Sequence, residues 1–151
     1  MMRALIMIWV LVLVMPISHA SEQNVLMIRS SQPFPEAMTT LQNAIIDRKY
    51  TLSRVQRIDV GLEKAGYETD RYRIVFFGKL DEIKPITDKY PEMAAFLPLK
   101  MVLFSEEEDT MLVALNPVHL SQVVSDESLK PLFARWLHDV KAIMNDVRIG
   151  E

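Results

Sequence analysis

The C-terminal part of the chain, residues 129–147, constrains the fold more than any other segment. Apolar side chains recur there at steps of three and four residues over about five helical turns. They are Leu129, Leu132, Phe133, Trp136, Leu137, Val140, Ile143, Met144 and Val147. Arg135, Asp139, Lys141 and Asp146 occupy the opposite face. The pattern predicts a long helix whose apolar stripe packs on a core, with a partner surface as the alternative use of that stripe.

Short runs rich in apolar, β-branched and aromatic residues predict strands upstream of this helix. They are residues 24–29, 50–60, 72–77, 99–105 and 110–115. The last two form a hairpin with an acidic tip, residues 106–109. Helices are expected from Pro33 to near Lys49 and over residues 81–90, where Pro85 fits the first turn. Shorter helical turns are expected at residues 61–66 and 92–97, and the whole pattern indicates an α+β fold.

The first 20 residues have the pattern of a secretory signal peptide. Arg3 precedes an unbroken apolar run over residues 4–15, and Pro16 ends that run. Ser18 and Ala20 are small residues at the two positions that signal peptidase reads. The run is shorter than the roughly 20 residues that a membrane-spanning helix needs. We therefore expect cleavage after Ala20 and a single periplasmic or secreted domain, residues 21–151, with an uncleaved membrane anchor as the alternative.

Composition excludes several classes of chemistry. The chain has no cysteine, so it has no disulfides, thiol nucleophile, iron–sulfur cluster or cysteine-linked lipid. Its formal net charge is −3, and loss of Arg3 with the signal segment makes it −4. A mildly acidic domain is not expected to bind nucleic acid, which needs a basic surface, and nothing predicts a membrane partner after cleavage.

Four motifs in a fixed order resemble a known family. They are Asp59–Gly66 (DVGLEKAG), Tyr72–Gly78 (YRIVFFG), Leu97–Phe104 (LPLKMVLF) and, after the acidic turn, Asn116-Pro117. In this order the chain resembles the domain of unknown function family 302, over residues 38–147. The resemblance implies an antiparallel sheet with helices on one face, in a β-α-β(4)-α order like that of the TATA-binding protein. It also implies dimers, and it supplies no activity.

The chain departs from that family at one turn. Family members often have Asn-Pro after the glycine that ends the second of these motifs, whereas Lys79 and Leu80 follow Gly78 here. If that turn shapes a ligand site, the resemblance implies that the site is altered or absent in this chain.

Five residues are candidates for a ligand site between the sheet and its loops. They are Arg73, Gly78, Pro98, Asn116 and His119. Arg73 can meet an anion if its face of the sheet is open, while the neighbouring Tyr72 points to the other face. His119 follows a strand end and is the one candidate acid–base group, because histidine titrates near neutral pH. A loop histidine without a role is the alternative.

No metal, cofactor or catalytic motif is recognisable. His119 and His138 lack metal-ligand spacing, and the acidic tip lacks the alternating ligands of a calcium loop. Phosphate-binding glycine loops and the GxSxG elbow are absent. His138 is expected to lie partly packed beside the helical stripe. The methionines beyond the signal segment are expected to fill the core: Met27, Met38, Met93, Met101, Met111 and Met144.

The sequence thus favours a non-enzymatic binding or accessory module for a small ligand or a periplasmic protein. One alternative is an enzyme with His119 as acid–base group and Arg73 as anion anchor. Another is a structural homodimer that pairs through a sheet edge or through the last helix.

Overall fold

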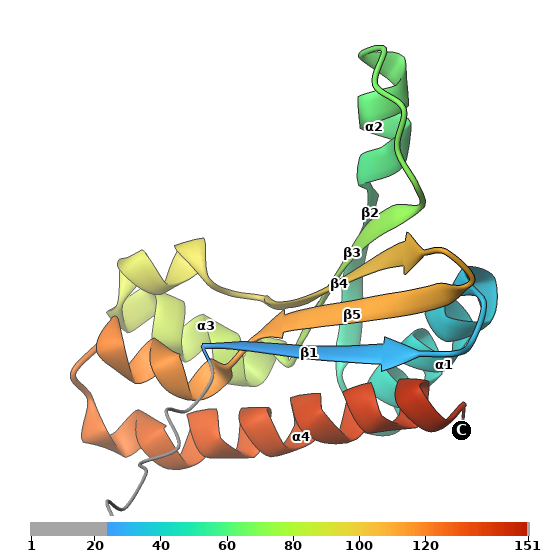
Figure 1. The fold of residues 1–151 in the computed structure, drawn as a ribbon. Coiled ribbons are helices and arrows are strands. Elements are labelled where there is room, and N and C mark those ends of the chain that lie inside the picture. Colours follow the sequence, from blue (N-terminus) through green and yellow to red (C-terminus); the bar gives the residue numbers. More distant parts are fainter. Residues whose placement is uncertain (1–23, 151) are drawn as a thin grey trace, which may run out of the picture.

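The computed structural model describes residues 24–150, and the signal segment with its cleavage position after Ala20 lies outside this range. Figure 1 shows a sheet with helices beneath it, a helical group at one end and an arm at the other. The elements in chain order are β1 (Val25–Ser30), α1 (Phe34–Asp47), β2 (Thr51–Arg57), α2 (Ile58–Lys64), β3 (Tyr72–Gly78), α3 (Leu80–Lys89), η1 (Pro91–Ala95), β4 (Leu99–Glu106), β5 (Asp109–Leu115), η2 (Pro117–Gln122), η3 (Glu127–Leu129) and α4 (Lys130–Ile149).

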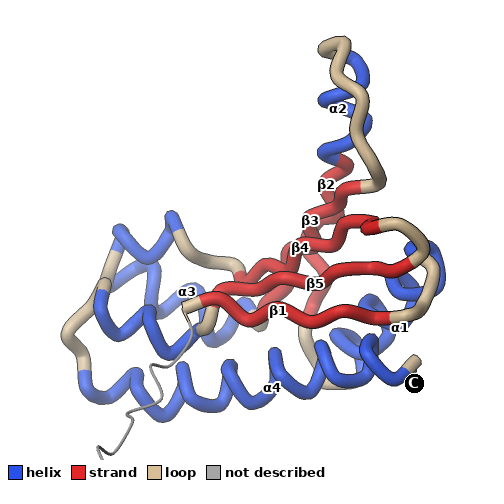
Figure 2. The backbone as a smooth tube through the Cα atoms, in the orientation of Figure 1, coloured by secondary structure: helices blue, strands red, loops and turns tan. Residues whose placement is uncertain are grey.

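The five strands form one antiparallel sheet in the order β1-β5-β4-β3-β2 (Figure 2). The predicted α+β class and the β-α-β(4)-α order are confirmed, with α2 and α3 inserted between successive strands. The centre of the sheet is β4, whereas β3 lies second from the edge. β1 and β2 are the edge strands, so each has one side whose backbone N–H and C=O groups pair with no other strand of the sheet. β1 contacts α4, and β2 contacts α1.

The core lies between the sheet and the pair α1 and α4. Alternate residues of the inner strands point into it, and Val75, Leu103 and Leu112 are fully buried. They belong to the same core cluster as Phe133 and Trp136 of α4, whose ring centroids are 5.6 Å apart. Burying each such side chain contributes about 1.5–3 kcal/mol relative to leaving it in water. This layer holds the long C-terminal helix that the sequence predicts.

Helix α4 has clear start and stop signals. Pro131 lies in its first turn, where a missing N–H costs nothing, and Gly150 ends it in the left-handed region with φ 81°. The buried members of the predicted stripe are Phe133, Trp136, Val140, Ile143, Met144 and Val147. His138 is fully on the solvent side, so its predicted partial packing is wrong: one step beyond Leu137 turns the side chain off the stripe.

The segment after β2 differs from its prediction as a strand up to Val60. β2 ends at Arg57, and α2 follows directly as a short helix. Figure 1 shows α2 rising from the β2–β3 end of the sheet, away from α4. We call residues 58–71 the arm. Its base is fixed by an ion pair between Asp59 and Arg73, in which both side chains are largely buried.

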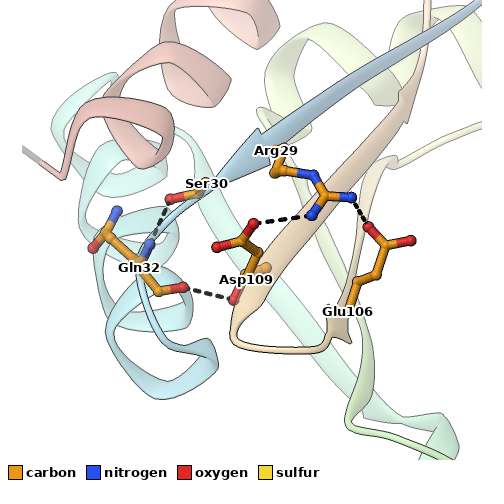
Figure 3. A network of polar contacts seen from close by, with 6 residues as sticks. Arg29, Ser30, Gln32, Glu106 and Asp109 are labelled. Atoms are coloured by element: carbon orange, nitrogen blue, oxygen red, sulfur yellow. Dashed lines mark hydrogen bonds and ion pairs between the residues drawn. The ribbon is translucent and has the colours of Figure 1, made fainter.

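Two further details correct the sequence reading. Pro85 lies inside α3 and not in its first turn; it is exposed, so water can reach the carbonyl that lacks an N–H partner. The acidic tip, predicted only as a turn between two strands, also forms ion pairs. Arg29 of β1 forms ion pairs with Glu106 and, at 2.9 Å, with Asp109, and these contacts join β1 to the hairpin (Figure 3).

Candidate functional site

One hollow lies where β3 ends and α3 begins. It has a volume of about 390 Å³ and walls that are mainly apolar. We call it the β3–α3 pocket; its lining residues are Thr51, Ser53, Gly78, Leu80, Ile83 and Pro98. The pocket brings together Gly78 and Pro98, two of the five candidate ligand residues. They come close because Gly78 ends β3 while Pro98 immediately precedes its neighbour β4.

The backbone explains why this pocket exists. A Cβ at position 78 would clash with Ile83 Cδ1, so the glycine lets Ile83 pack directly on the strand end. On the other side, the β2–β3 register shifts between Leu52 and Arg54, which leaves Ser53 in a bulge of the edge strand. Bulges re-aim side chains at sheet rims and are frequent beside functional sites. Ser53 and Gly78 thus both line the hollow, from the neighbouring strands β2 and β3.

A larger, open groove continues from the pocket along the outer side of α3. It has a volume of about 950 Å³ and shares Thr51 and Leu80 with the pocket. We call it the lysine groove; it is lined by Lys49, Thr51, Lys79, Leu80, Asp81, Glu82, Lys84, Pro85 and Asp88. Leu80 forms a wall of both hollows and is 75% exposed, which is unusual for a large apolar side chain.

The groove is lined by three lysines and three carboxylates, but they are not all paired with one another. Lys84 pairs with Asp88 at 2.5 Å, and Glu82 pairs with Arg135 at 2.7 Å. Lys49 and Lys79 have no ion-pair partner within residues 24–150. Lys79 instead lies with Nζ 4.5 Å from the centre of the Tyr50 ring, an attractive position for a cation. The groove therefore offers two ammonium groups to an anion.

A polar network behind the groove holds α3 against α4. The Trp136 indole donates a hydrogen bond of 2.7 Å to Glu82, and the Arg135 guanidinium contacts the other Glu82 oxygen at 2.7 Å. Tyr50 donates to Asp139 at 2.7 Å. Burial, aided by the hydrogen bond to Asp139, raises the pKa of Tyr50 well above its usual value. The tyrosine stays neutral, and Lys79 rests on an uncharged ring.

A second candidate surface is the face of the sheet that α1 and α4 leave uncovered. Alternation along the strands places mainly apolar side chains there. We call them the open face: Val25 and Met27 of β1, Met111, Val113 and Leu115 of β5, Val102 and Phe104 of β4, and Tyr72, Ile74 and Phe76 of β3. Met27 is 57% exposed and Val25 46% exposed. Met27 and Met111 thus line a surface, contrary to the predicted core role.

The arm stands beside this open face. A hollow of about 520 Å³ lies at its foot, between Thr69, Asp70, Arg71 and Tyr72 of the chain entering β3 and the side chains of Val102, Phe104, Ser105 and Val113. The arm itself covers little, because Asp59 is the one buried residue of α2. Tyr67 at its far end is 65% exposed. Most other exposed residues of the arm are charged or small, so Tyr67 is its one exposed large apolar side chain.

Arg73 lies on the helix side of the sheet, not on the open one, so it is not free to meet an anion as predicted. Its guanidinium pairs with Asp59 and lies 5.7 Å from the Phe34 ring centre. The Arg73 hydrogen bond holds the pKa of Asp59 below its usual value, against the opposing effect of burial. The strand alternation places Tyr72 on the open face instead.

Asn116 and His119 follow the end of β5 that is level with the start of β4, the same end of the sheet as Gly78 and Pro98, but neither lines the β3–α3 pocket. Asn116 is buried and caps η2 by accepting a 3.1 Å hydrogen bond from the Val118 amide. His119 Nδ1 lies 3.0 Å from Gln122 Nε2, while its Nε2 is buried with no hydrogen-bond partner among the described residues. Arg73 lies near the opposite end of the strands, so the pair proposed for an enzyme does not converge.

Two further findings concern the described part of the chain. Within residues 24–150, no three histidine or carboxylate side chains come together in a way that could hold a metal ion. Over the same range, no helix is both long and apolar enough to cross a bilayer.

The fold defines a small α+β protein with a helix pair on one sheet face. The chain belongs to the family described as domain of unknown function DUF302, whose model matches residues 26–147. It is also similar in fold to the crystal structure of the uncharacterized conserved protein DUF302 from Bacillus stearothermophilus. The TM-score is 0.74 at 17% sequence identity, over 83% of this chain and 98% of that one. No curated protein matches the sequence.

Sequence reasoning missed Lys49, Lys79, Leu80 and Ile83 as site residues. Lys79 and Leu80 had a signal, because they replace Asn-Pro at the turn where the resemblance expects a shaped site. Lys49 had none: it reaches the groove only because the left-handed backbone at φ 63° turns the chain from α1 into β2. A lysine at the end of a helix otherwise reads as a surface residue.

Proposed function

We propose that the mature chain, exported and cleaved after Ala20, is a non-catalytic binding module that pairs with a second copy of itself through the open face. The observation that carries this proposal is the apolar character of a sheet face that no described element covers. Soluble monomers rarely expose a large continuous apolar patch, and such patches mark interaction sites. The face is also poor in charge at its centre, as interface cores are.

The size of the face supports a partner of this chain's own shape. Five strands of six to eight residues span roughly 20 by 20 Å, on a sheet that Figure 1 shows to be strongly twisted. A standard interface needs about 800 Å² of surface from each partner, so the face supplies roughly half. The arm of the second copy can supply the rest, because it rises on the same side of the sheet (Figure 1).

Charge complementarity favours a second copy as the occupant. Lys100 and Glu106 lie at opposite ends of the outward side of β4, with Val102 and Phe104 between them. A two-fold axis across the strands at the level of Leu103 opposes Lys100 of one copy to Glu106 of the other, which also pairs with Arg29 of its own copy. The same axis opposes Val102 to Phe104 and, on β5, Val113 to Met111. The surface is thus self-complementary, as a two-fold interface requires.

The test is the mass of residues 21–151 in solution from micromolar to millimolar concentration, by light scattering and sedimentation velocity. We expect a dimer for the wild type and a monomer for Val102→Glu, which puts a charge at the centre of the face. The matched control is Ile46→Glu on α1, because Ile46 is 52% exposed and far from the open face; it should remain dimeric.

A wild type that stays monomeric at the highest concentration, or a Val102→Glu variant that stays dimeric, would overturn the proposal. If Val102→Glu does not fold by circular dichroism, Met27→Lys serves in its place, because an edge position that is 57% exposed tolerates a charge in the monomer.

A further inference from the structure

We infer that the β3–α3 pocket and the lysine groove together form a binding site for a small amphipathic anion, one with an apolar body and a single acidic head. This site is separate from the proposed pairing surface, because none of its lining residues belongs to the open face. The two hollows are continuous through Thr51 and Leu80, so one ligand can occupy both.

The pocket fits the apolar body. Gly78, Ile83 and Pro98 give it apolar walls, and Leu80 stands at its mouth with three quarters of its surface in water. Ligand sites of this kind combine an apolar cavity with a few placed polar groups. A volume of about 390 Å³ holds roughly a dozen non-hydrogen atoms at liquid density. A ligand that covered Leu80 would remove its exposed apolar surface from water, which is favourable.

The groove fits the acidic head. The carboxylates of Glu82 and Asp88 are already engaged by Arg135 and Lys84. Among the remaining charged groups of the groove, the ammonium groups of Lys49 and Lys79 and the carboxylate of Asp81 have no ion-pair partner within residues 24–150. Two positive charges thus face one negative charge. Helix α3 also begins at this groove, and its first-turn amides add partial positive charge. The imbalance favours one negative group beside Lys79.

Lys79 is the residue best placed to select the ligand. Its side chain lines the groove, and the next residue, Leu80, lines both hollows. The neutral Tyr50 ring supports the Lys79 ammonium at 4.5 Å and limits its conformational freedom. An ammonium that is held in place loses less entropy when it binds an anion than a free surface lysine does.

The test is titration of residues 21–151 with decanoate below its micelle concentration, followed by amide chemical shifts in NMR and by calorimetry. We expect saturable shifts at Gly78, Leu80 and Ile83. Decanol and acetate should each bind at least tenfold more weakly than decanoate, because decanol lacks the carboxylate and acetate lacks the alkyl chain. Vesicles of phosphatidylglycerol should not co-sediment with the protein, which separates a free amphiphile from a lipid surface as the source of the ligand.

Three variants distinguish this site from general attraction to surface lysines. Lys79→Gln should weaken decanoate about tenfold, the effect of about 1.4 kcal/mol. Lys84→Gln, in the same groove but paired with Asp88, should change it less than twofold. Leu80→Ala should weaken decanoate and leave acetate unchanged. All three positions are solvent-accessible, and Lys84 and Leu80 are exposed, so folding should be retained.

Chemical shifts that do not saturate, or that map to other residues, would overturn the inference. Equal effects of Lys79→Gln and Lys84→Gln on decanoate binding would also overturn it. So would decanol binding as tightly as decanoate, or binding of the protein to vesicles alone. The Val102→Glu variant keeps this outcome separate from that of the pairing proposal. It should bind decanoate as the wild type does even if it is monomeric.

Discussion

The contact that holds the wall of the β3–α3 pocket can be tested by removing the Glu82 carboxylate. Glu82 accepts a 2.7 Å hydrogen bond from the indole of Trp136, a residue that is 1% exposed, and it pairs with Arg135. In Glu82→Ala the buried indole N–H loses its acceptor. In Glu82→Gln an amide oxygen can still accept that hydrogen bond, while the charge is lost.

The magnitude follows from these two contacts. A buried donor left without an acceptor costs about 1–3 kcal/mol. The ion pair with Arg135 adds at most about 1 kcal/mol, because the arginine side chain is 41% exposed. We expect Glu82→Ala to lower the free energy of unfolding by about 2–4 kcal/mol. Glu82→Gln should lower it by about 1 kcal/mol, the value of the weakened ion pair.

The assay is urea unfolding followed by tryptophan fluorescence. Trp136 is the single tryptophan of residues 21–151, since the other one, Trp9, lies in the signal segment. The emission therefore reports directly on the environment of the indole that Glu82 contacts. It should shift to the red in folded Glu82→Ala if α3 separates from α4 and water reaches the ring.

The matched control is Asp88→Ala on the same helix. Asp88 pairs with Lys84, and the two side chains are 62% and 64% exposed, so this variant should change stability by less than about 0.5 kcal/mol. Equal losses for Glu82→Ala and Asp88→Ala, or Glu82→Gln as damaging as Glu82→Ala, would refute the reasoning. If Glu82 holds α3 in place, Glu82→Ala should also bind decanoate more weakly, because Leu80 and Ile83 lie on the same helix.

Two further predictions concern the arm and the core. Because the pKa of Asp59 is lowered in the folded state, its pairing with Arg73 stabilises the fold above the unfolded carboxyl pKa of about 4 and loses this effect as pH falls through the folded value. Unfolding measured from pH 5 down to pH 2 should therefore be less pH-dependent in Asp59→Asn than in the wild type; parallel profiles would contradict this. Leu103→Ala, at a fully buried position of the central strand, should cost about 2–5 kcal/mol in urea unfolding, and a loss below 1 kcal/mol would show that the core tightens around the cavity.

The long-range architecture was predictable where a pattern runs over many residues. The α4 stripe spans the whole helix, so a single misplaced residue does not change the interpretation. The β4–β5 hairpin was equally clear, because two apolar runs flank an acidic turn. The actual turn has two residues, Glu107 and Glu108, with Glu107 at φ 55°. Single-residue conformations of this kind have no sequence signal unless glycine or asparagine supplies it.

The arm shows where local patterns fail. Residues 50–60 were predicted to form one strand, yet the chain becomes helical at Ile58. The apolar residues Leu52, Val55 and Ile58 recur there at every third position and not at every second. The cause is tertiary: Asp59 pairs with Arg73, which lies on the next strand, and this contact fixes α2 at the end of β2. Arg73 was expected to be available for an anion, and the same ion pair explains why it is not. A contact between residues on different elements cannot be read from either segment alone.

The apolar residues of the open face are visible in the sequence, but their pattern does not show that one face of the sheet is left uncovered. β3, β4 and β5 each contain a continuous apolar run, Ile74–Phe77, Met101–Phe104 and Met111–Leu115, a pattern typical of strands buried on both faces. The structure covers one face with α1 and α4 and leaves the other uncovered by any described element. The sequence thus supplies apolar residues for two sheet faces, whereas the described elements form one helical layer. Continuous exposure of Val102, Phe104 and Val113 to water would be unfavourable. Burial of these side chains in the dimer proposed above would explain why they are apolar.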